Sequence, residues 1–476
     1  MNPKEAAGLT MHEAAELIRG KRLSPVEVAR ACLERIAQHD GRLRAFIMVT
    51  EESALAQARE AEQAVMRGDP LGPLHGVPLA LKDTFAMRGV RTTCGSKLLE
   101  NNIPDFDGAV VDRLRKAGAV FLGTLNMHEF ALGATTANPH YGMGRNPWDE
   151  GKIPGGSSGG SGAAVAASMC LGSVGTDAGG SVRLPSSLCG IVGLKPTYGR
   201  ISNFGTLPLS LTMDHSGPMT RSVADAALLL QVLAGHDPRD LASSPLKVPS
   251  YSKALTKRIK GIKIGLPKEY FAESIDPEVR VAVMAAIESL EALGAIAQEV
   301  SVPHCRYAPA AFVPLVLSEA SAVHARYLRT RAREYGSEVR NLLYTGLMMP
   351  ARRYVQAQRV RALVVRDLAA ALQHVDSLVM PTVTIPAPGV GQQSVNLDGR
   401  NVNVAAALAR FTLPFNLAGL PAISVPCGFT ASGLPIGLQI AGAPFAESTI
   451  LQVAHAYESH NRWKERNPFQ QSAEVH

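Results

Sequence analysis

Three short stretches of the chain hold residues that could carry out nucleophilic chemistry. Residues 155–162 read GGSSGGSG, residues 176–187 read TDAGGSVRLPSS, and Lys82 ends the apolar stretch GVPLALK. A serine hydroxyl is a weak nucleophile unless a base takes its proton, and no histidine lies in either serine-containing stretch. A lysine at the end of a buried strand favours its neutral amine and can act as that base. Alternatively, Lys82 is an edge lysine that pairs with Asp83.

Other roles for the glycines of residues 155–162 fit less well. A flexible linker would not lead directly into AAVAASMCLGSVG, which has the composition of a domain interior. A P-loop needs a lysine after its last glycine, and a dinucleotide-binding loop needs a strand before its first. The hydrolase pattern G-x-S-x-G occurs twice here, but a run of only glycine and serine produces it by chance.

The second stretch has a better context for an attacking serine. The segment CLGSVGTD is typical of a strand, and the turn that follows it leads to Ser181. Glycines allow a tight turn in which successive backbone N–H groups point at one anion. The backbone N–H groups of Ala178, Gly179, Gly180 and Ser181 are therefore predicted to bind the oxyanion of a tetrahedral intermediate.

The composition excludes several classes of protein. The 476 residues are 46% hydrophobic and 19% charged, which is typical of a globular protein with a large core. Six scattered cysteines form no CxxC pair, which indicates reduced thiols rather than disulfides or a zinc site. The stretch HEAAE lacks the second histidine of a zincin. We therefore expect no metal and no cofactor.

The charge is uneven along the chain. The net charge is +7, and residues 321–366 hold ten arginines, no lysine and two glutamates. This segment could bind tRNA or phosphate, but no nucleic-acid-binding module surrounds it, and solvated helix faces explain it better. The first residues carry no secretory signal, and no uncharged apolar run approaches the roughly 18 residues of a membrane span. We expect a cytoplasmic protein.

Strand-like and helix-like segments alternate around these motifs. Residues 1–70 are predicted to be helical, with capping boxes at Thr10/Glu13 and Ser24/Glu27. Residues 76–85 and 118–126 read as strands on either side of a helix, which indicates an α/β fold. Residues 265–375 are mostly helix-patterned, and residues 422–442 read as a hairpin. Because strand-like segments lie on both sides of the helical middle, we predict one sheet with an inserted helical region.

Together these motifs resemble the amidase signature family. The resemblance rests on GVPLALKD, PGGSSGGSGAAVA and GTDAGGSVRLPSSLCGIVGLKPT, in this order, with Ser157 and Ser181 24 residues apart. RNPWD before them, and GPMTRSVADAALLL, NLAGLPAISVPCG and LPIGLQIAG after them, extend it along most of the chain. The family implies an α/β fold with a central mixed sheet flanked on both faces by helices.

The resemblance also implies roles for particular residues. Ser181 would be the nucleophile that becomes acylated, and Ser157, after a cis peptide bond, would relay its proton to the base Lys82. Ala178 to Ser181 would form the oxyanion hole. The implied supporting residues of this loop are Ser158, Asp177 and Arg183. Met127 matches a position that lines the substrate pocket in relatives, although core packing explains it equally well.

The sequence departs from one branch of the family, the glutamine-hydrolysing A subunit of glutamyl-tRNA amidotransferase. Arg361 falls at that subunit's glutamine-binding arginine, but Ala409 falls where an aspartate is expected. Phe312 and Val313 lie where its tyrosine is expected. Without the aspartate carboxylate, the α-ammonium of glutamine has no partner. Apolar residues at these positions suggest a less polar substrate.

The resemblance therefore implies a hydrolase that cleaves aryl or acyl amides, with carbamates and esters as further substrates, through an acyl-enzyme on Ser181. Two alternatives stay open: the amidotransferase A subunit, and a non-catalytic binding or scaffold subunit that kept the fold. We expect a small-molecule amide as the binding partner, with neither a membrane nor nucleic acid, and a homodimer stays open.

The domain prediction is a single unit over residues 1–476. Its parts are the N-terminal helices (1–70), the signature core (71–235), the inserted helical region (260–380) and the C-terminal part of the core (381–476).

Overall fold

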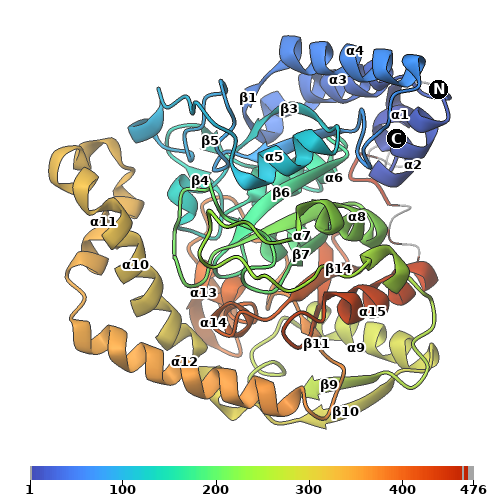
Figure 1. Ribbon diagram of the computed structural model, residues 1–476. Helices are drawn as coiled ribbons and strands as arrows, with labels where there is room; N and C mark the ends of the chain where they lie inside the picture. Colours follow the sequence, from blue (N-terminus) through green and yellow to red (C-terminus); the bar gives the residue numbers. More distant parts are fainter. Residues whose placement is uncertain (1–2, 462, 464–465, 470–476) are drawn as a thin grey trace.

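The computed structural model describes residues 3–461, 463 and 466–469. In this part of the chain, eleven strands form one mixed sheet, with helices packed around it (Figure 1). The strands, in their order across the sheet, are β1 (Phe46–Val49), β3 (Val120–Leu125), β2 (Pro78–Lys82), β6 (Gly172–Asp177), β8 (His215–Thr220), β7 (Val192–Lys195), β14 (Ala422–Phe429), β15 (Pro435–Ala441), β11 (Ser377–Pro381), β9 (Lys263–Pro267) and β10 (Ile296–Val300).

The fold is α/β, as the sequence predicted. The described helices are α1 (Pro3–Gly8), α2 (Met11–Arg19), α3 (Pro25–Leu43), α4 (Glu51–Arg67), α5 (Ala109–Lys116), α6 (Gly159–Ala166), α7 (Arg183–Cys189), α8 (Val223–Leu233), α9 (Pro277–Ala292), α10 (Ala308–Thr330), α11 (Ser337–Leu347), α12 (Ala351–Ala371), α13 (Val404–Ala409), α14 (Leu413–Leu417) and α15 (Glu447–His460). Two hairpins lie outside the main sheet, β4 (Ala137–Asn138) with β5 (Gly142–Met143) and β12 (Ser394–Leu397) with β13 (Arg400–Asn403).

The middle of the sheet carries the predicted motifs. Strand β2 pairs in parallel with β3 on one side and with β6 on the other. Every residue of these three strands is buried, as their nearly continuous apolar sequences require of strands covered on both faces. The parallel pairing of β2 and β6 brings the end of each strand, Lys82 and Asp177, to the same edge of the sheet.

Helix α6 follows the first glycine-rich stretch, and its small side chains allow unusually close packing. All eight of its residues are buried. A Cβ atom added to Gly160 would lie 2.4 Å from the carbonyl oxygen of Asn126 and 2.5 Å from that of Ala45. A larger side chain at this position would push the helix away from the sheet, which explains why the glycine-rich sequence is part of the core and not a linker.

Both capping boxes predicted in the N-terminal helices are present. The side chain of Thr10 caps α2 and that of Ser24 caps α3, each with its glutamate three residues later. Helix α2 is tied to α8 across the chain, because the Asp225 carboxylate accepts hydrogen bonds from the backbone N–H groups of Met11 and His12. These contacts attach the first helices to the core.

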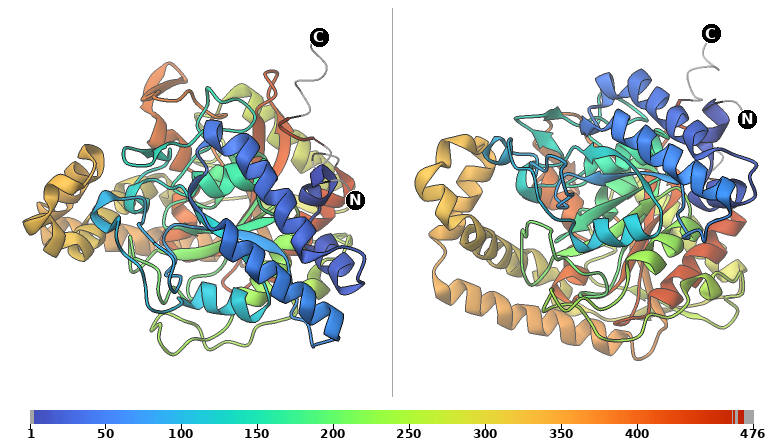
Figure 2. Two further views of the ribbon diagram at one scale, coloured as in Figure 1. Left: turned by 90° about the horizontal axis from the view of Figure 1, so that it is seen from above. Right: turned by 45° about the horizontal axis from the view of Figure 1, so that its top comes forward.

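The region that we expected to be mostly helical also contributes strands. Strands β9 and β10 pair in parallel, and β9 also pairs with β11, so all three extend the main sheet at its far edge. Short strands between long helices carry too few residues for their pattern to stand out. Helices α10, α11 and α12 form an arm that projects from the body of the molecule (Figure 2).

Only weak evidence for a membrane span comes from the described residues. The segment Pro303–Thr330 is long and apolar enough, with a mean hydropathy of 1.2, but half of that window is buried inside the fold. Core helices of soluble proteins pass the same test.

Candidate active site

Lys82 lies at the centre of the site with no exposed surface. Its ammonium nitrogen Nζ donates hydrogen bonds to Ser157 Oγ at 2.6 Å and to Thr176 Oγ1 at 2.7 Å. Burial lowers the pKa of Lys82 to about 7, although the charges of Asp214 and Asp177 oppose the shift. A lysine with this pKa is partly neutral near physiological pH and can accept a proton.

Asp83 does not pair with Lys82, as the alternative interpretation required. Its carboxylate accepts hydrogen bonds from the backbone N–H groups of Thr93 and Gly95 and from the Thr93 hydroxyl. Thr176, the second acceptor for Lys82, is a residue that the sequence analysis missed. A threonine in a strand is common, so only its position beside Lys82 in space distinguishes it.

Ser157 lies in the first glycine-rich stretch, and the Gly156–Ser157 peptide bond is cis. The Ser157 carbonyl oxygen accepts a hydrogen bond from the backbone N–H of His128 at 3.0 Å. The hydroxyl of the next residue, Ser158, donates to the carbonyl oxygen of Thr176 at 3.2 Å. These bonds fix the turn against strand β6, so that the Ser157 hydroxyl faces Lys82.

Ser181 follows strand β6 and lies at the wall of a cavity, with 9% of its surface exposed. Its carbonyl oxygen accepts a hydrogen bond from the Ser158 backbone N–H at 3.3 Å, which joins the two serine-containing turns. Within residues 3–461, no hydrogen bond connects the hydroxyls of Ser157 and Ser181. Such contacts are often long before substrate binds and shorten in the reacting complex.

The predicted oxyanion loop is only partly available for a ligand. The Gly180 N–H, which we expected to be free, donates to the Asp177 carboxylate at 2.6 Å. That expectation is wrong for Gly180, because the aspartate needs this donor to hold the turn. The N–H groups of Ala178, Gly179 and Ser181 have no hydrogen-bond acceptor among the described residues, so three donors remain for an oxyanion.

Glycine is required at both middle positions of this loop. Gly180 has a φ of +128°, and a Cβ atom there would lie 2.3 Å from Thr412 Oγ1. A Cβ atom on Gly179 would lie 2.7 Å from the Phe312 ring. Larger residues would therefore move the loop or the cavity wall.

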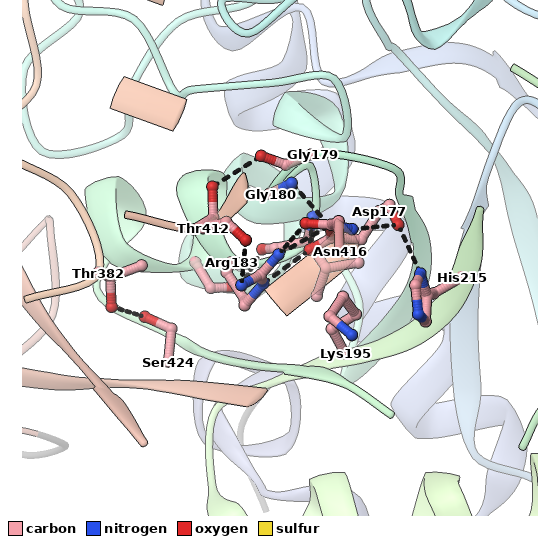
Figure 3. Close-up of polar contacts among 12 residues, drawn as sticks. Asp177, Gly179, Gly180, Arg183, Lys195, His215, Thr382, Thr412, Asn416 and Ser424 are labelled. Carbon is pink, nitrogen blue, oxygen red and sulfur yellow. Dashed lines mark hydrogen bonds and ion pairs between the residues drawn. The ribbon is translucent and has the colours of Figure 1, made fainter. Parts of the chain in front are cut away.

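A buried ion pair supports the loop from below (Figure 3). The Arg183 guanidinium contacts both oxygens of Asp177 at 3.0 Å, and neither side chain has exposed surface. Arg183 also donates to Asn416 Oδ1 at 2.6 Å and to Gln439 Oε1 at 2.7 Å. Burial raises the pKa of Asp177, but Arg183, Lys195 and Asn416 outweigh burial and hold that pKa well below its usual range. Asp177 is thus a permanent anion that orders the loop.

The cavity beside Ser181 has a volume of about 370 Å³ and lies between the loop, the α10–α11 arm and α13. No residue that lines it carries a charge. Its apolar lining includes Leu132, Leu209, Phe312, Val316, Leu342 and Ala409. Small-molecule sites are typically concave and apolar with a few polar groups, and here Ser181 and Asn403 are the polar members.

Arg361 does not reach into this cavity. Its guanidinium donates to the carbonyl oxygen of Leu417 at 2.6 Å and to the hydroxyl and carbonyl oxygens of Thr212, each at 3.1 Å. Ala409, Phe312 and Val313 line the cavity as uncharged residues. The residues at the aligned glutamine-binding positions therefore offer no charge to a substrate.

Met127 is fully buried and is not among the residues that line the cavity. It packs beside Gly95, where a Cβ atom would lie 3.0 Å from its side chain. Core packing is therefore the interpretation that its position supports. Among the described residues, no group of three histidine, cysteine, aspartate or glutamate side chains could hold a metal ion.

Comparison with known proteins defines the class of this fold and site. The amidase family model matches residues 27–451. The chain therefore belongs to the amidase family.

Particular relatives narrow the comparison. The A subunit of glutamyl-tRNA(Gln) amidotransferase from Moorella thermoacetica is 44% identical over 97% of this chain and 98% of its own length. A solved structure described as part of an unexpected vestigial protein complex that reveals the origins of an s-triazine catabolic enzyme is 36% identical. It has a TM-score of 0.91 and covers 95% of this chain and 99% of its own. A bacterial aryl acylamidase of the amidase signature family is 26% identical, with a TM-score of 0.89, covering 96% of this chain and 97% of its own.

These relatives overturn one expectation. From the sequence we expected a small-molecule amide as the partner, no nucleic acid, and at most a second copy of the chain. Relatives that are 42–44% identical over nearly their whole length are instead named as one subunit of a tRNA-dependent enzyme. That expectation is wrong, because the finding points to other protein chains as partners. The motifs could not reveal this, since they lie inside the fold, whereas partners bind the surface.

Proposed function

We propose that this protein cleaves a carboxylic amide through an acyl-enzyme on Ser181. The observation that carries the proposal is the contact of 2.6 Å between Lys82 Nζ and Ser157 Oγ, buried next to the turn that bears Ser181. A buried amine with a pKa of about 7 beside a serine is a base suited to neutral pH.

The proposed reaction proceeds in two steps. The Ser181 hydroxyl attacks the amide carbonyl carbon, and its proton passes through the Ser157 hydroxyl to neutral Lys82. The N–H groups of Ala178, Gly179 and Ser181 stabilise the oxyanion. The tetrahedral intermediate then collapses, the C–N bond breaks, and the leaving nitrogen takes the proton back along the same path. Water, activated by the same base, releases the carboxylic acid and restores Ser181.

The cavity supports an amide whose acyl part is apolar. Burying apolar substrate surface contributes about 25 cal/mol per Å², whereas a charged group placed there would lose its hydration without gaining a partner. Aryl or acyl amides fit this lining, and carbamates and esters share the same reacting carbonyl. The proposal concerns the bond that is cleaved and leaves the chain free to work within an assembly.

A second candidate is release of ammonia from glutamine as the A subunit of a tRNA amidotransferase. The relatives' names favour it, and the identity of 44% over 97% of the chain is its support. The uncharged cavity and the engaged Arg361 count against it, because glutamine carries both an α-ammonium and an α-carboxylate.

One experiment tests the function and separates the candidates. The purified chain is incubated with a series of aryl and acyl amides and, separately, with glutamine, and release of amine or ammonia is followed. We expect hydrolysis of an apolar amide and its loss in Ser181→Ala. Activity on glutamine alone, appearing only with added partner subunits, would favour the second candidate. Failure of a fluorophosphonate to label Ser181 would contradict the acyl-enzyme itself and favour a non-catalytic subunit.

We also propose that the protein works in the cytoplasm. Five of its six cysteines are buried as free thiols, and none of the six is paired with another. Fractionation of source cells with an antibody against the chain tests this.

A further inference from the structure

Apolar side chains gather on the outside of the arm, where α11 turns into α12. Met348 is 81% exposed and Val355 57% exposed, and Leu347 and Tyr344 are each more than 40% exposed. All four fall within twelve residues of a helix–turn–helix that projects from the body of the molecule (Figure 2). Clustered exposed apolar residues with a polar rim are typical of protein interaction sites.

Unpaired positive charge surrounds these residues. Arg352, Arg353 and Arg359 are exposed, and among the residues that the structure describes no carboxylate lies within 4.0 Å of them. Positions 352, 355 and 359 are spaced by three and four residues in a helix, so Val355 lies between two arginines on one face. The rim therefore lacks counter-charges within its own chain.

We propose that this elbow surface, formed by Tyr344, Leu347, Met348, Arg352, Val355 and Arg359, binds an acidic protein partner. Its apolar centre would bury the exposed side chains of the elbow, and acidic groups on the partner would meet the arginine rim. Complementary charge of this kind raises the association rate and excludes wrong partners.

Two other occupants fit the surface less well. A second copy of the chain related by a two-fold axis would bring the same arginines face to face, and like charges at an interface are costly. Nucleic acid would pair with the arginines, but protein–nucleic acid interfaces are polar, and the exposed Met348 and Val355 would remain unused.

The position of the elbow connects it to the site without making it part of the site. Leu342, on the same helix α11, lines the cavity, whereas Tyr344, Leu347 and Met348 lie outside it. A bound partner would hold the helix that forms one cavity wall. The inference concerns binding and does not depend on which amide is cleaved.

The test begins with the full chain, tagged and isolated from its own source cells. The polypeptide recovered with it in equal amount is identified by mass spectrometry, produced separately, and titrated against the pure chain. We expect an acidic protein whose Kd rises at least about tenfold in Met348→Glu/Val355→Glu and in Arg352→Glu/Arg353→Glu. We also expect the Kd to rise with salt, because salt screens exposed charges.

Matched variants control for surface charge in general. Met66→Glu/Val281→Glu changes two residues that are 67% and 70% exposed on other helices, and it should leave the Kd unchanged. Three outcomes would overturn the proposal: an equal loss in this control, a recovered partner that binds both elbow variants normally, or no recovered protein. Purified tRNA whose binding is lost only in the arginine variant would also overturn it. Every readout is a binding constant, so failure of the proposed catalysis would leave the result interpretable.

Discussion

The amine of Lys82 is held between two hydroxyls in a place that water does not reach. Both acceptors, Ser157 Oγ and Thr176 Oγ1, lie within 2.7 Å of its nitrogen. Burial favours the neutral amine, whereas the nearby carboxylates favour the protonated form, and the balance leaves the pKa of Lys82 at about 7. The reactivity of the site is therefore set by the opposition of two effects on one residue.

The pH dependence of activity follows from this balance. Protonated Lys82 cannot accept the serine proton, so kcat/KM should fall about tenfold per unit as the pH drops below about 7. Lys82→Ala should reduce turnover by about 10²- to 10⁴-fold while the circular dichroism spectrum stays unchanged. A flat profile between pH 5 and 8, or an active Lys82→Ala variant, would show that the base lies elsewhere.

Asp214 provides a control for this assignment. Burial raises the pKa of Asp214 to about 7, so it and Lys82 titrate as a pair whose apparent midpoint belongs to both. Removing its charge in Asp214→Asn removes an interaction that favours protonated Lys82, so the midpoint should move to lower pH. Asp105→Asn, at an exposed position, should leave the midpoint unchanged.

Thr176 is expected to position the lysine. Thr176→Val keeps the shape of the side chain but removes the acceptor at 2.7 Å from Lys82 Nζ. Loss of a buried hydrogen bond worth about 1–2 kcal/mol corresponds to roughly a ten- to thirtyfold fall in kcat. Stopped-flow acylation measurements check this, and Thr176→Ser, which restores the hydroxyl, should recover most of the rate. Full activity in Thr176→Val would contradict the role.

The sequence could predict the reacting residues but not their neighbours. Lys82, Ser157 and Ser181 stand in motifs with fixed spacing, whereas Thr176 and Asp214 acquire meaning only through contacts across strands. The occupied N–H of Gly180 was equally hidden, because a glycine-rich turn does not reveal which donors its own aspartate uses. Local pattern predicts which atoms exist, and only the fold decides which of them are free.

At the scale of elements, the nucleophile-bearing turn between β6 and α7 depends on distant segments. Arg183, at the start of α7, contacts Asn416 in α14 and Gln439 in β15 as well as Asp177. Strands β2, β3 and β6 were predictable, since each is a short apolar run. Strands β9 and β10 were not, because long helices surround them. The cavity was also beyond prediction, since its walls come from α10, α11 and α13.

Breaking this buried pair should destabilise the whole fold. Arg183→Met leaves the Asp177 carboxylate buried without its cation, which costs about 3–5 kcal/mol in the free energy of unfolding. Urea unfolding measures this loss. The folded pKa of Asp177 lies below its unfolded value, so the stabilisation is complete above pH ~4 and is lost as the pH falls further. Arg331→Met, at an exposed pair with Glu334, should show no measurable change; an equal loss there would contradict the argument.

At the scale of the whole molecule, one sheet unites the chain. Strand β14, from the C-terminal end, pairs with β7 on one side and with β15 on the other, so the two halves of the sequence share hydrogen bonds at the centre. The single domain over residues 1–476 stays a prediction, and this pairing supports it. The surface could not be interpreted from the motifs, which is why the expected partners were wrong.

A single domain should unfold in one cooperative step. Far-ultraviolet circular dichroism reports the helices, and tryptophan fluorescence reports Trp148, whose ring packs against Phe429 of β14 at 5.1 Å. We expect both signals to change with the same urea midpoint. Two separate midpoints would mean that the inserted helical region unfolds independently of the sheet.

The contacts of Arg183 have a consequence for a chain that is still being made. Ribosomes deliver Lys82, Ser157 and Ser181 within the first two-fifths of the sequence, but Asn416 and Gln439 emerge only near its end. Until then Arg183 and Asp177 lack the partners that close the turn around Ser181. A nascent or prematurely terminated chain thus carries every reacting side chain without the finished turn, and the hydrolase becomes competent only once its synthesis is nearly complete.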